Sequence, residues 1–509
     1  GAAIAQASTT AASDAVGLDG GRGVDFLTNE GDITVQAESI ADDMNATANF
    51  TGFASGNVDS TATATAAGIR SDDADDETAA GDRIANLAGG SVTVKSHAKV
   101  DARNYVVQGG GAVFAEVVTT NAAQAIGIAG GTGADSVING GILDVMAWSE
   151  ADVSNMALQL IGVTAGKAGI DSTANGTGIG GGDGRNAITN QSTGEIKVKA
   201  EVESRALSLS GGFSAGVDLA GVGARAFSMG IVSGDDDDTL LNEGRIDVTT
   251  RALGEAGNAA IGLAYLTNAT SLTEATLAGI SAGGGNDLIF NSGAMTVGSV
   301  KINDEPLAKA DTESVAFSLL GFVTSNLGAK VTTMGVAGGS GDDTIVNAGA
   351  LQVGDSDNWM VIGESLGYAG QFLAFFEITA AGTTATVVSS GIDGGEGNDT
   401  LINDSSGDLR VYARGFSDVY AESKVSTFGM SAAHADSRVK AIATGIRGGG
   451  GNDAIENKGS INVKAYGRAQ GEARTWVGVG KAHTESSANV TADVIGVDAG
   501  MGINEVRNF

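Results

Sequence analysis

A glycine followed by a branched apolar residue recurs ten times along the chain at a nearly constant spacing. These pairs begin at Gly17, Gly68, Gly127, Gly178, Gly230, Gly279, Gly335, Gly391, Gly445 and Gly496. The 479 residues between the first and the last pair make nine periods of about 53 residues. A unit of this size cannot bury an apolar face alone, but stacked units can. The spacing therefore predicts a repeat architecture.

Two polar positions keep a fixed place inside the unit. Eight residues after the opening glycine stands Asp25, Asp135, Asn186, Asp238, Asp287, Asp343, Asp399, Asp453 or Asn504, and in the second unit Asp82 takes this place after a six-residue acidic insertion. Four residues further on stands Asn29, Asn86, Asn139, Asn190, Asn242, Asn291, Asn347, Asn403, Asn457 or Asn508. Ten asparagines at one offset indicate a position that the fold requires.

The rest of each unit alternates between apolar and polar residues, the pattern of a half-buried β-strand. In SINVKAYGRAQ (460–470), Ile461, Val463 and Ala465 fall on one face. A second alternating run, such as DSRVKAIATGI (436–446), leads back to the next opening glycine. No segment has the pattern of a long helix. Each unit is thus predicted to be a glycine-rich turn, a short strand ending at Asn, a long strand and a return strand.

These features predict an all-β fold, a β-solenoid of about ten stacked coils with about 53 residues per coil. Small inward residues imply a flat cross-section, and the Gly/Asp-rich turns should lie along one edge. Residues 1–16 are expected to be the return strand of a partial first coil, 17–495 nine complete units and 496–509 a partial last coil. A string of small antiparallel sandwiches is the main alternative.

In a solenoid the recurring polar residues would stack from coil to coil. Buried asparagines could then bond side chain to side chain, which satisfies groups that are costly to bury. Stacked carboxylates would repel one another unless a cation lies between them. Ca²⁺ suits such a position because it accepts six to eight oxygen ligands with tolerant geometry.

The turn sequences resemble a known calcium-binding repeat. GGEGNDTLI (394–402), GGGGNDAIE (448–456), GGSGDDTIV (338–346) and GGTGADSVI (130–138) are similar to the nonapeptide G-G-x-G-x-D-x-U-x of RTX (haemolysin-type) proteins. The resemblance implies Ca²⁺ between neighbouring coils, with Asp25, Asp135, Asp343, Asp399 and Asp453 as ligands, and Asp238 and Asp287 as looser matches. Asp82 holds the same place, although its turn lacks the glycine pattern. RTX proteins repeat the nonapeptide in tandem, whereas this chain has one per unit.

Composition restricts the partners. The chain has 61 acidic and 29 basic residues, a formal net charge of −32 and no cysteine. This charge excludes nucleic acid as a partner, since its phosphates would be repelled. It also argues against binding to an anionic membrane, and no apolar stretch is long enough for membrane insertion. Acidity without cysteine fits an extracellular, secreted or bacterial cell-surface location. The N–x–G–x–I–x–V step is also similar to β-solenoid surface adhesins of autotransporter type.

No catalytic arrangement is evident. His97, His434 and His483 lie in different units and form no constellation. One segment, 356–382, gathers aromatic residues in a chain that has few, namely Trp359, Tyr368, Phe372, Phe375 and Phe376. It is expected either to thicken the core locally or to contact a neighbouring subunit.

We therefore expect a calcium-stabilised structural protein of a surface fibre, filament, sheath or layer, and not an enzyme. The partial units at 1–16 and 496–509 favour head-to-tail assembly of identical chains or continuation in a longer chain. A long adhesin stalk that contacts a host or polysaccharide receptor is an alternative. A polysaccharide lyase or epimerase on a β-solenoid is a less favoured one.

Overall fold

The computed structural model describes residues 1–71, 81–299, 306–371 and 376–509. The fold is all-β, as predicted: strands make up 84% of the chain, and no helix occurs among the described residues. For the same residues, no helix that could span a membrane is found. All strand pairs are parallel, the arrangement expected of a β-solenoid.

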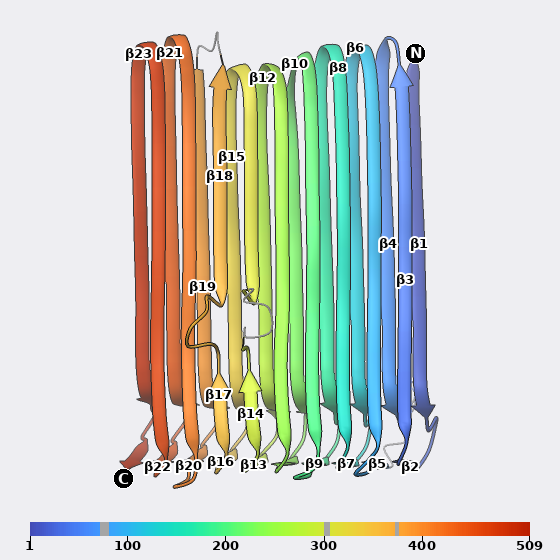
Figure 1. Ribbon diagram of the computed structural model, residues 1–509, viewed down its shortest axis with the longest axis vertical. Helices are drawn as coiled ribbons and strands as arrows, with labels where there is room; N and C mark the ends of the chain where they lie inside the picture. The colour runs from blue at the N-terminus through green and yellow to red at the C-terminus, as the bar shows by residue number, and fades with distance from the viewer. Residues whose placement is uncertain (72–80, 300–305, 372–375) are drawn as a thin grey trace.

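The described strands form two sheets, one of ten short strands and one of fourteen mostly long strands. The short strands are β2 (Phe26–Asn29), β5 (Arg83–Asn86), β7 (Ser136–Asn139), β9 (Ala187–Asn190), β11 (Thr239–Asn242), β13 (Leu288–Asn291), β16 (Thr344–Asn347), β20 (Thr400–Asn403), β22 (Ala454–Asn457) and β24 (Glu505–Asn508). Each ends at the recurring Asn, as the sequence predicted. They line one end of the molecule (Figure 1).

The second sheet runs over most of the molecule. Its strands are β1 (Ala2–Asp19), β3 (Asp32–Asn49), β4 (Gly52–Arg70), β6 (Ser91–Ala129), β8 (Ile142–Gly180), β10 (Glu195–Gly234), β12 (Arg245–Gly284), β14 (Ala294–Val297), β15 (Ala308–Ser340), β17 (Ala350–Val353), β18 (Val361–Gln371), β19 (Phe376–Glu396), β21 (Asp408–Gly450) and β23 (Ser460–Asp498). Equivalent residues of successive units lie side by side: Ile196 of β10 pairs with Leu143 of β8 and Ile246 of β12.

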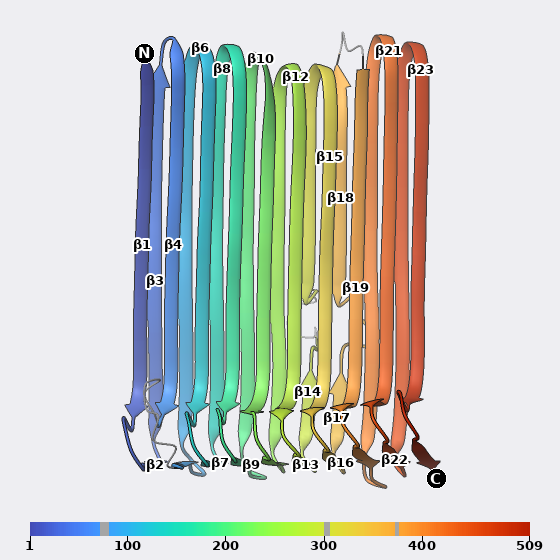
Figure 2. The ribbon, with the colours of Figure 1, turned by 180° about the vertical axis from the view of Figure 1, so that it is seen from behind.

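Most long strands fold back on themselves, so that one strand contributes to two facing layers. The first half of β6 pairs with β3, and its second half pairs with β4. The chain reverses near Gly111, where the backbone φ of 122° is a conformation that glycine adopts more readily than other residues. Figure 2 shows these reversals at the end opposite the short strands. Small apolar side chains such as Val94, Ala98 and Ala102 fill the space between the layers, and each is fully buried.

Two interruptions of the long strands were not predicted. Strand β14 ends at Val297 and strand β17 ends at Val353, and the sheet resumes at β15 and β18 (Figure 1). Gly298 and Gly354 follow these two ends with positive φ values of 76° and 79°. Between β17 and β18, residues 354–360 form an excursion from the sheet that ends at Met360, which is buried and bonds to Leu307 and Arg414 through its backbone.

The expected local thickening of the core by aromatic residues is wrong for the three that are described. Trp359, Tyr368 and Phe376 are only half-buried, and each packs against an aromatic ring of a neighbouring unit. These side chains are half-buried because they point outward. The residues on either side of Tyr368, for example, are buried and point inward, so Tyr368 lies on the opposite face of the strand. Phe372 and Phe375 lie outside the described residues.

Candidate metal-binding turn column

The glycine-rich turns join a return strand to the next short strand. In the turn before β16, Gly339 and Gly341 have φ values of 113° and 124°, a region that other residues rarely adopt. The same geometry recurs at Gly395 and Gly397 one unit later. Glycine thus permits the tight path that brings the following Asp under the turn.

The recurring Asp residues lie in one column, and their carboxylates accept backbone hydrogen bonds. The backbone N–H of Asp343 donates to Oδ1 of Asp399 at 2.8 Å. We call these ten residues the Asp column. Its donor-to-acceptor steps run Asp25 to Asp82, Asp82 to Asp135, Asp135 to Asn186, Asn186 to Asp238, Asp238 to Asp287, Asp287 to Asp343, Asp343 to Asp399, Asp399 to Asp453 and Asp453 to Asn504, at 2.6–3.1 Å. The eight predicted ligands are therefore brought together in order.

Sequence reasoning missed this backbone role of the column. Asn186 and Asn504 lack a charge, but each amide oxygen accepts the same hydrogen bond as the carboxylates do. The presence of Asn at two of ten positions was the available signal. It indicates that the position requires an acceptor in every unit, whereas a charge is dispensable in some.

The second carboxylate oxygen has a different environment. The Oδ2 atoms of Asp25, Asp82, Asp287, Asp343, Asp399 and Asp453 are buried and accept no hydrogen bond. A Cβ placed on Gly338 would lie 2.3 Å from Oδ2 of Asp343 and 2.6 Å from the carbonyl oxygen of Gly394. Gly394 has the same relation to Asp399 and Gly448, at 2.4 and 2.6 Å. Both oxygens are acceptors that face the space where a side chain of the glycine would lie, and a proton or a cation bound to them would be favourable.

Burial raises the pKa of these carboxyls in the middle of the column. It raises the pKa of Asp343 to about 7, and the pKa values of Asp287 and Asp399 to about 6. The backbone hydrogen bond opposes this rise in each case, whereas neighbouring carboxylates add to it. The column thus holds buried carboxyls for which a bound cation would be favourable.

The donors present fit Ca²⁺ chemically, because carboxylate and carbonyl oxygens are its usual ligands. Within the described ranges, no group of three or more His, Cys, Asp or Glu side chains surrounds one point. An ion in the column would therefore take one carboxylate oxygen from a turn and most of its other ligands from backbone carbonyls.

A second, exposed ladder runs beside the Asp column, and the sequence reasoning did not single it out. It consists of the residue that precedes the column position in five consecutive units: Asp237, Asn286, Asp342, Asn398 and Asn452. The N–H of Asn398 donates to Oδ1 of Asp342 at 2.7 Å. In this ladder the later unit donates to the earlier one, the reverse of the Asp column. In each of these turns from Asn286 onward, two consecutive backbone N–H groups are therefore satisfied, one by a side chain of the preceding unit and the other by a side chain of the following unit.

The predicted asparagine ladder is confirmed. The side-chain N–H of each ladder Asn donates to the side-chain oxygen of the next, from Asn29 through Asn508, at 2.7–2.9 Å. Asn347 and Asn403, in the middle of this ladder, are fully buried. The ladder follows the short strands and holds their ends in register.

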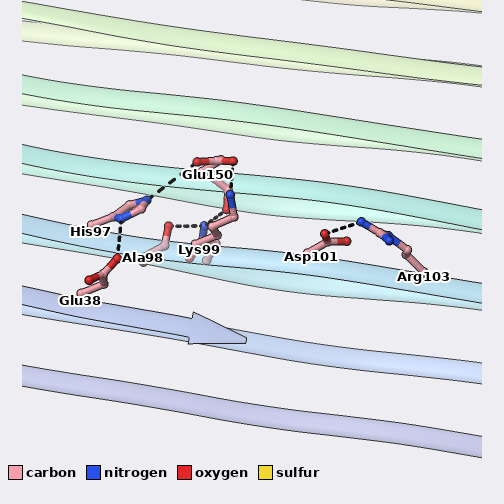
Figure 3. Close-up of polar contacts among 8 residues, drawn as sticks. Glu38, His97, Ala98, Lys99, Asp101, Arg103 and Glu150 are labelled. Carbon is pink, nitrogen blue, oxygen red and sulfur yellow. Dashed lines mark hydrogen bonds and ion pairs between the residues drawn. The ribbon is translucent and has the colours of Figure 1, made fainter. Parts of the chain in front are cut away.

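The histidines lie apart from these ladders. His97 stacks on Trp148 with ring centroids 4.1 Å apart, and its two nitrogens lie 3.5 Å from Glu38 and 3.9 Å from Glu150. Figure 3 shows Glu38, His97 and Glu150 on three successive strands, with Lys99 bound to Glu150. His434 lies 3.5 Å from Glu485 in another unit. The arrangement is a set of surface contacts between neighbouring strands.

Comparison of the chain with protein-family models, with curated proteins and with solved structures finds no match.

Proposed function

We propose that this protein is an extracellular structural element, a β-solenoid stiffened by calcium. In this proposal each unit of about 53 residues forms one coil, and ten turns stack along one edge. The observation that carries the proposal is the line of buried carboxylate oxygens without hydrogen bonds in the Asp column. A static column of this kind supports mechanical stability, and the proposal assigns the protein no catalysis.

The residues that would hold calcium are Asp25, Asp82, Asp135, Asp238, Asp287, Asp343, Asp399 and Asp453, with carbonyl oxygens of the glycine turns. Bound Ca²⁺ would supply the positive charge that buried carboxylates lack. A backbone N–H occupies Oδ1 of Asp82, Asp287, Asp343, Asp399 and Asp453, so in these residues the buried Oδ2 is the oxygen left for an ion. The RTX-like turn sequences support this assignment.

Thermal unfolding with and without calcium tests the proposal. Calcium should raise the melting temperature in a concentration-dependent way, because an ion that binds only the folded state stabilises it. EDTA should reverse the effect, and Mg²⁺ should not reproduce it, because Mg²⁺ demands stricter geometry. Asp42 lies outside the column and is exposed, so Asp42→Asn is a control that should keep the full calcium response. A melting curve that is identical in calcium and in excess EDTA would contradict the proposal.

We further propose that copies of the chain associate head to tail. The inward columns of the first units, such as Leu27 and Ile33, are only partly buried, and so are Ile461 and Val497 of the last units. A further coil in the same register, from a second copy or from a longer chain, would cover both sets and extend the asparagine ladder, since Asn508 offers a donor and Asn29 an acceptor. Contacts of one such kind give filaments. Protein that stays monomeric at high concentration in calcium and shows no filaments by electron microscopy would contradict this.

A further inference from the structure

In six consecutive units the chain reverses within a stretch of uncharged residues. Each stretch is 12 to 18 residues long, although 18% of the whole chain is charged. The six stretches are 44–58, 104–115, 153–166, 206–217, 256–273 and 314–329. Figure 2 shows the reversals side by side at the end of the molecule opposite the short strands. Across these six units, that end of the molecule therefore carries no charged residue.

Large apolar side chains are exposed along this end. Ile161 of β8, Phe213 of β10 and Ile261 of β12 lie at the reversals and are 65%, 70% and 54% exposed. Phe114 and Phe322 are also exposed. We call the exposed apolar side chains of the six uncharged stretches the apolar ridge. Single exposed apolar residues are ordinary on protein surfaces, but a contiguous row of them marks an interaction surface.

Strand pairing makes the ridge continuous. Phe213 pairs with Ile161 of the preceding unit. In the facing layer, Val217, Leu266 and Phe322 pair in turn across three units. Because paired strands lie about 4.8 Å apart, the side chains of one unit lie directly beside those of the next.

The ridge does not depend on where the chain begins or ends. Ile161, Phe213 and Ile261 lie on strands that have a paired strand on both sides. Head-to-tail stacking would add coils beside the first and last units, and so would a longer chain of the same period. Either addition would lengthen the ridge and leave it exposed.

The residues that border the uncharged stretches argue against an anionic lipid surface as the partner. Of the twelve residues that flank the six stretches, eight are acidic and four are basic. Two of the basic residues are paired with acidic ones, Lys167 with Glu116 at 2.7 Å and Lys330 with Glu274 at 2.8 Å. Anionic membranes attract basic segments, so they would repel this acidic border.

Charge favours a second copy that meets the first at the ridge. With a net charge of −32, two copies repel one another wherever their charged surfaces meet. The charged residues nearest to a reversal, such as Glu116 beside Gly111, lie about five residues along the strand, or about 16 Å. In an edge-to-edge contact the charges of the two copies would therefore be about 30 Å apart, well beyond the screening length of about 8 Å.

The ridge is also large enough for a specific interface. At about 4.8 Å per strand, six units make an edge about 30 Å long, and two layers about 10 Å apart with their outward side chains make it about 20 Å wide. This area is about 600 Å² per copy, and about 1,200 Å² in total is the lower limit for specific interfaces. Phe428 and Met430 of β21, which are exposed as well, extend the row further.

We propose that two copies of this chain associate edge to edge through their apolar ridges, related by a two-fold axis. Such a contact is self-complementary, because each ridge presents the same row to the other. Both rows repeat at the strand spacing, so the side chains of one copy would lie between those of the other along the whole contact. The contact uses neither the Asp column nor the ends of the stack. It therefore goes beyond the proposed function, and it would join two filaments as well as two single molecules.

Sedimentation velocity of the full chain over a dilution series tests the proposal. We expect a monomer–dimer equilibrium for the parent chain. The variant Ile161→Glu/Phe213→Glu places two charges on each ridge, and its dimer dissociation constant should be at least about tenfold higher. Where head-to-tail filaments form, their mass per length, measured by scanning transmission electron microscopy, should be halved in this variant. Both side chains are exposed in the single copy, and melting curves verify that the variant folds.

Leu288→Glu/Phe290→Glu is the matched control. It adds the same charge at exposed apolar positions of β13, at the opposite end of the molecule, and should associate like the parent chain. Cross-linking gives a second measurement that leaves the ridge uncharged. The chain has no cysteine, so Leu263→Cys places a single thiol on the ridge and Phe290→Cys places one on β13. A bis-maleimide should convert Leu263→Cys, but not Phe290→Cys, to covalent dimers.

Several results would overturn the proposal. These are a parent chain that forms neither dimers nor paired filaments, a ridge variant that associates like the parent, and a control that loses association to the same extent. Leu263→Cys that cross-links no better than Phe290→Cys would also overturn it. A monomeric parent chain that binds phosphatidylcholine vesicles would overturn it in favour of a lipid surface.

Discussion

Asp343 and Asp399, 56 residues apart in the sequence, are joined by a hydrogen bond from the backbone N–H of the first to the carboxylate of the second at 2.8 Å. One oxygen of Asp399 therefore completes the backbone of the neighbouring turn. The other oxygen is buried without a donor. Asp399 thus stabilises the neighbouring turn with one oxygen and offers the other oxygen as a possible ligand. The first prediction separates these two roles.

Asp399→Asn and Asp399→Ala should differ in a way that separates the roles. Asn retains an oxygen that can accept the N–H of Asp343, as Asn186 does for Asp135, so Asp399→Asn should fold well in EDTA. It should lose part of the calcium-dependent rise in melting temperature. Asp399→Ala removes the acceptor and should lose about 1–3 kcal/mol of stability even in EDTA. If Asp399→Asn responds to calcium as the parent does, Asp399 is not a calcium ligand.

Removal of one rung of the asparagine ladder should cost more in its middle than at its end. Asn403→Ala breaks the bonds to Asn347 and Asn457 and leaves buried partners unsatisfied. We expect a loss of about 1–3 kcal/mol in the free energy of unfolding, measured by denaturant titration. Asn508→Ala removes a single bond at an exposed position and should cost less. Equal losses at the two positions would show that the stability of a rung does not depend on hydrogen bonds to both of its neighbours.

Gly338→Ala should disturb the turn column. The added Cβ would lie 2.3 Å from Oδ2 of Asp343 and 2.6 Å from the carbonyl of Gly394, so the turn would have to shift. Thermal unfolding should show a loss of about 1–3 kcal/mol. Gly180→Ala is the control, because its Cβ would meet its nearest neighbours at 3.9 Å. Similar losses for both variants would indicate a general glycine effect and not a crowded column.

The buried carboxyl of Asp218 predicts a pH dependence that is independent of the turns. Burial raises the pKa of Asp218 from 3.8 to about 7, although the hydroxyls of Ser208 and Ser210 donate to Oδ1 and lower it. The folded protein therefore keeps the proton while the unfolded chain releases it. The contribution of Asp218 to stability is complete below about pH 4 and is lost as the pH rises to about 7.

Asp218→Asn should remove this dependence. Its stability relative to the parent chain should improve between pH 4 and pH 8, by on the order of 2–4 kcal/mol. Denaturant titrations of both proteins at these two pH values, in the same buffer system and at constant ionic strength, give the difference. A difference between parent and variant that does not change with pH would show that Asp218 does not titrate in this range.

Much of the fold was predictable because the repeat leaves many traces in one chain. Ten asparagines at one offset predicted a ladder, and alternating runs such as 460–470 predicted which residues point inward. The Asp column was located correctly, including Asp82 behind its insertion. Its hydrogen bonds to backbone N–H groups were not predicted, because sequence shows side chains but does not show which main-chain donors a turn leaves unsatisfied.

The strand interruptions were less predictable from the sequence. The units that begin at Gly279 and Gly335 are both 56 residues long, and the single Pro, Pro306, lies between β14 and β15. These were signals of an insertion, but they did not predict its structure. Trp359 packs against Phe416 and Tyr466 of two later units, and such contacts depend on how residues 354–360 fold over the sheet.

A crystal structure of the protein grown in calcium would test the central claim most directly. The account predicts anomalous difference peaks in a line along the glycine turns. In the middle of the stack, a peak should lie within about 2.3–2.6 Å of Oδ2 of Asp343 or Asp399 and of carbonyl oxygens from the adjacent turns. Ordered turns without peaks at saturating calcium, with the carboxyl oxygens bonded only to protein or water, would contradict it.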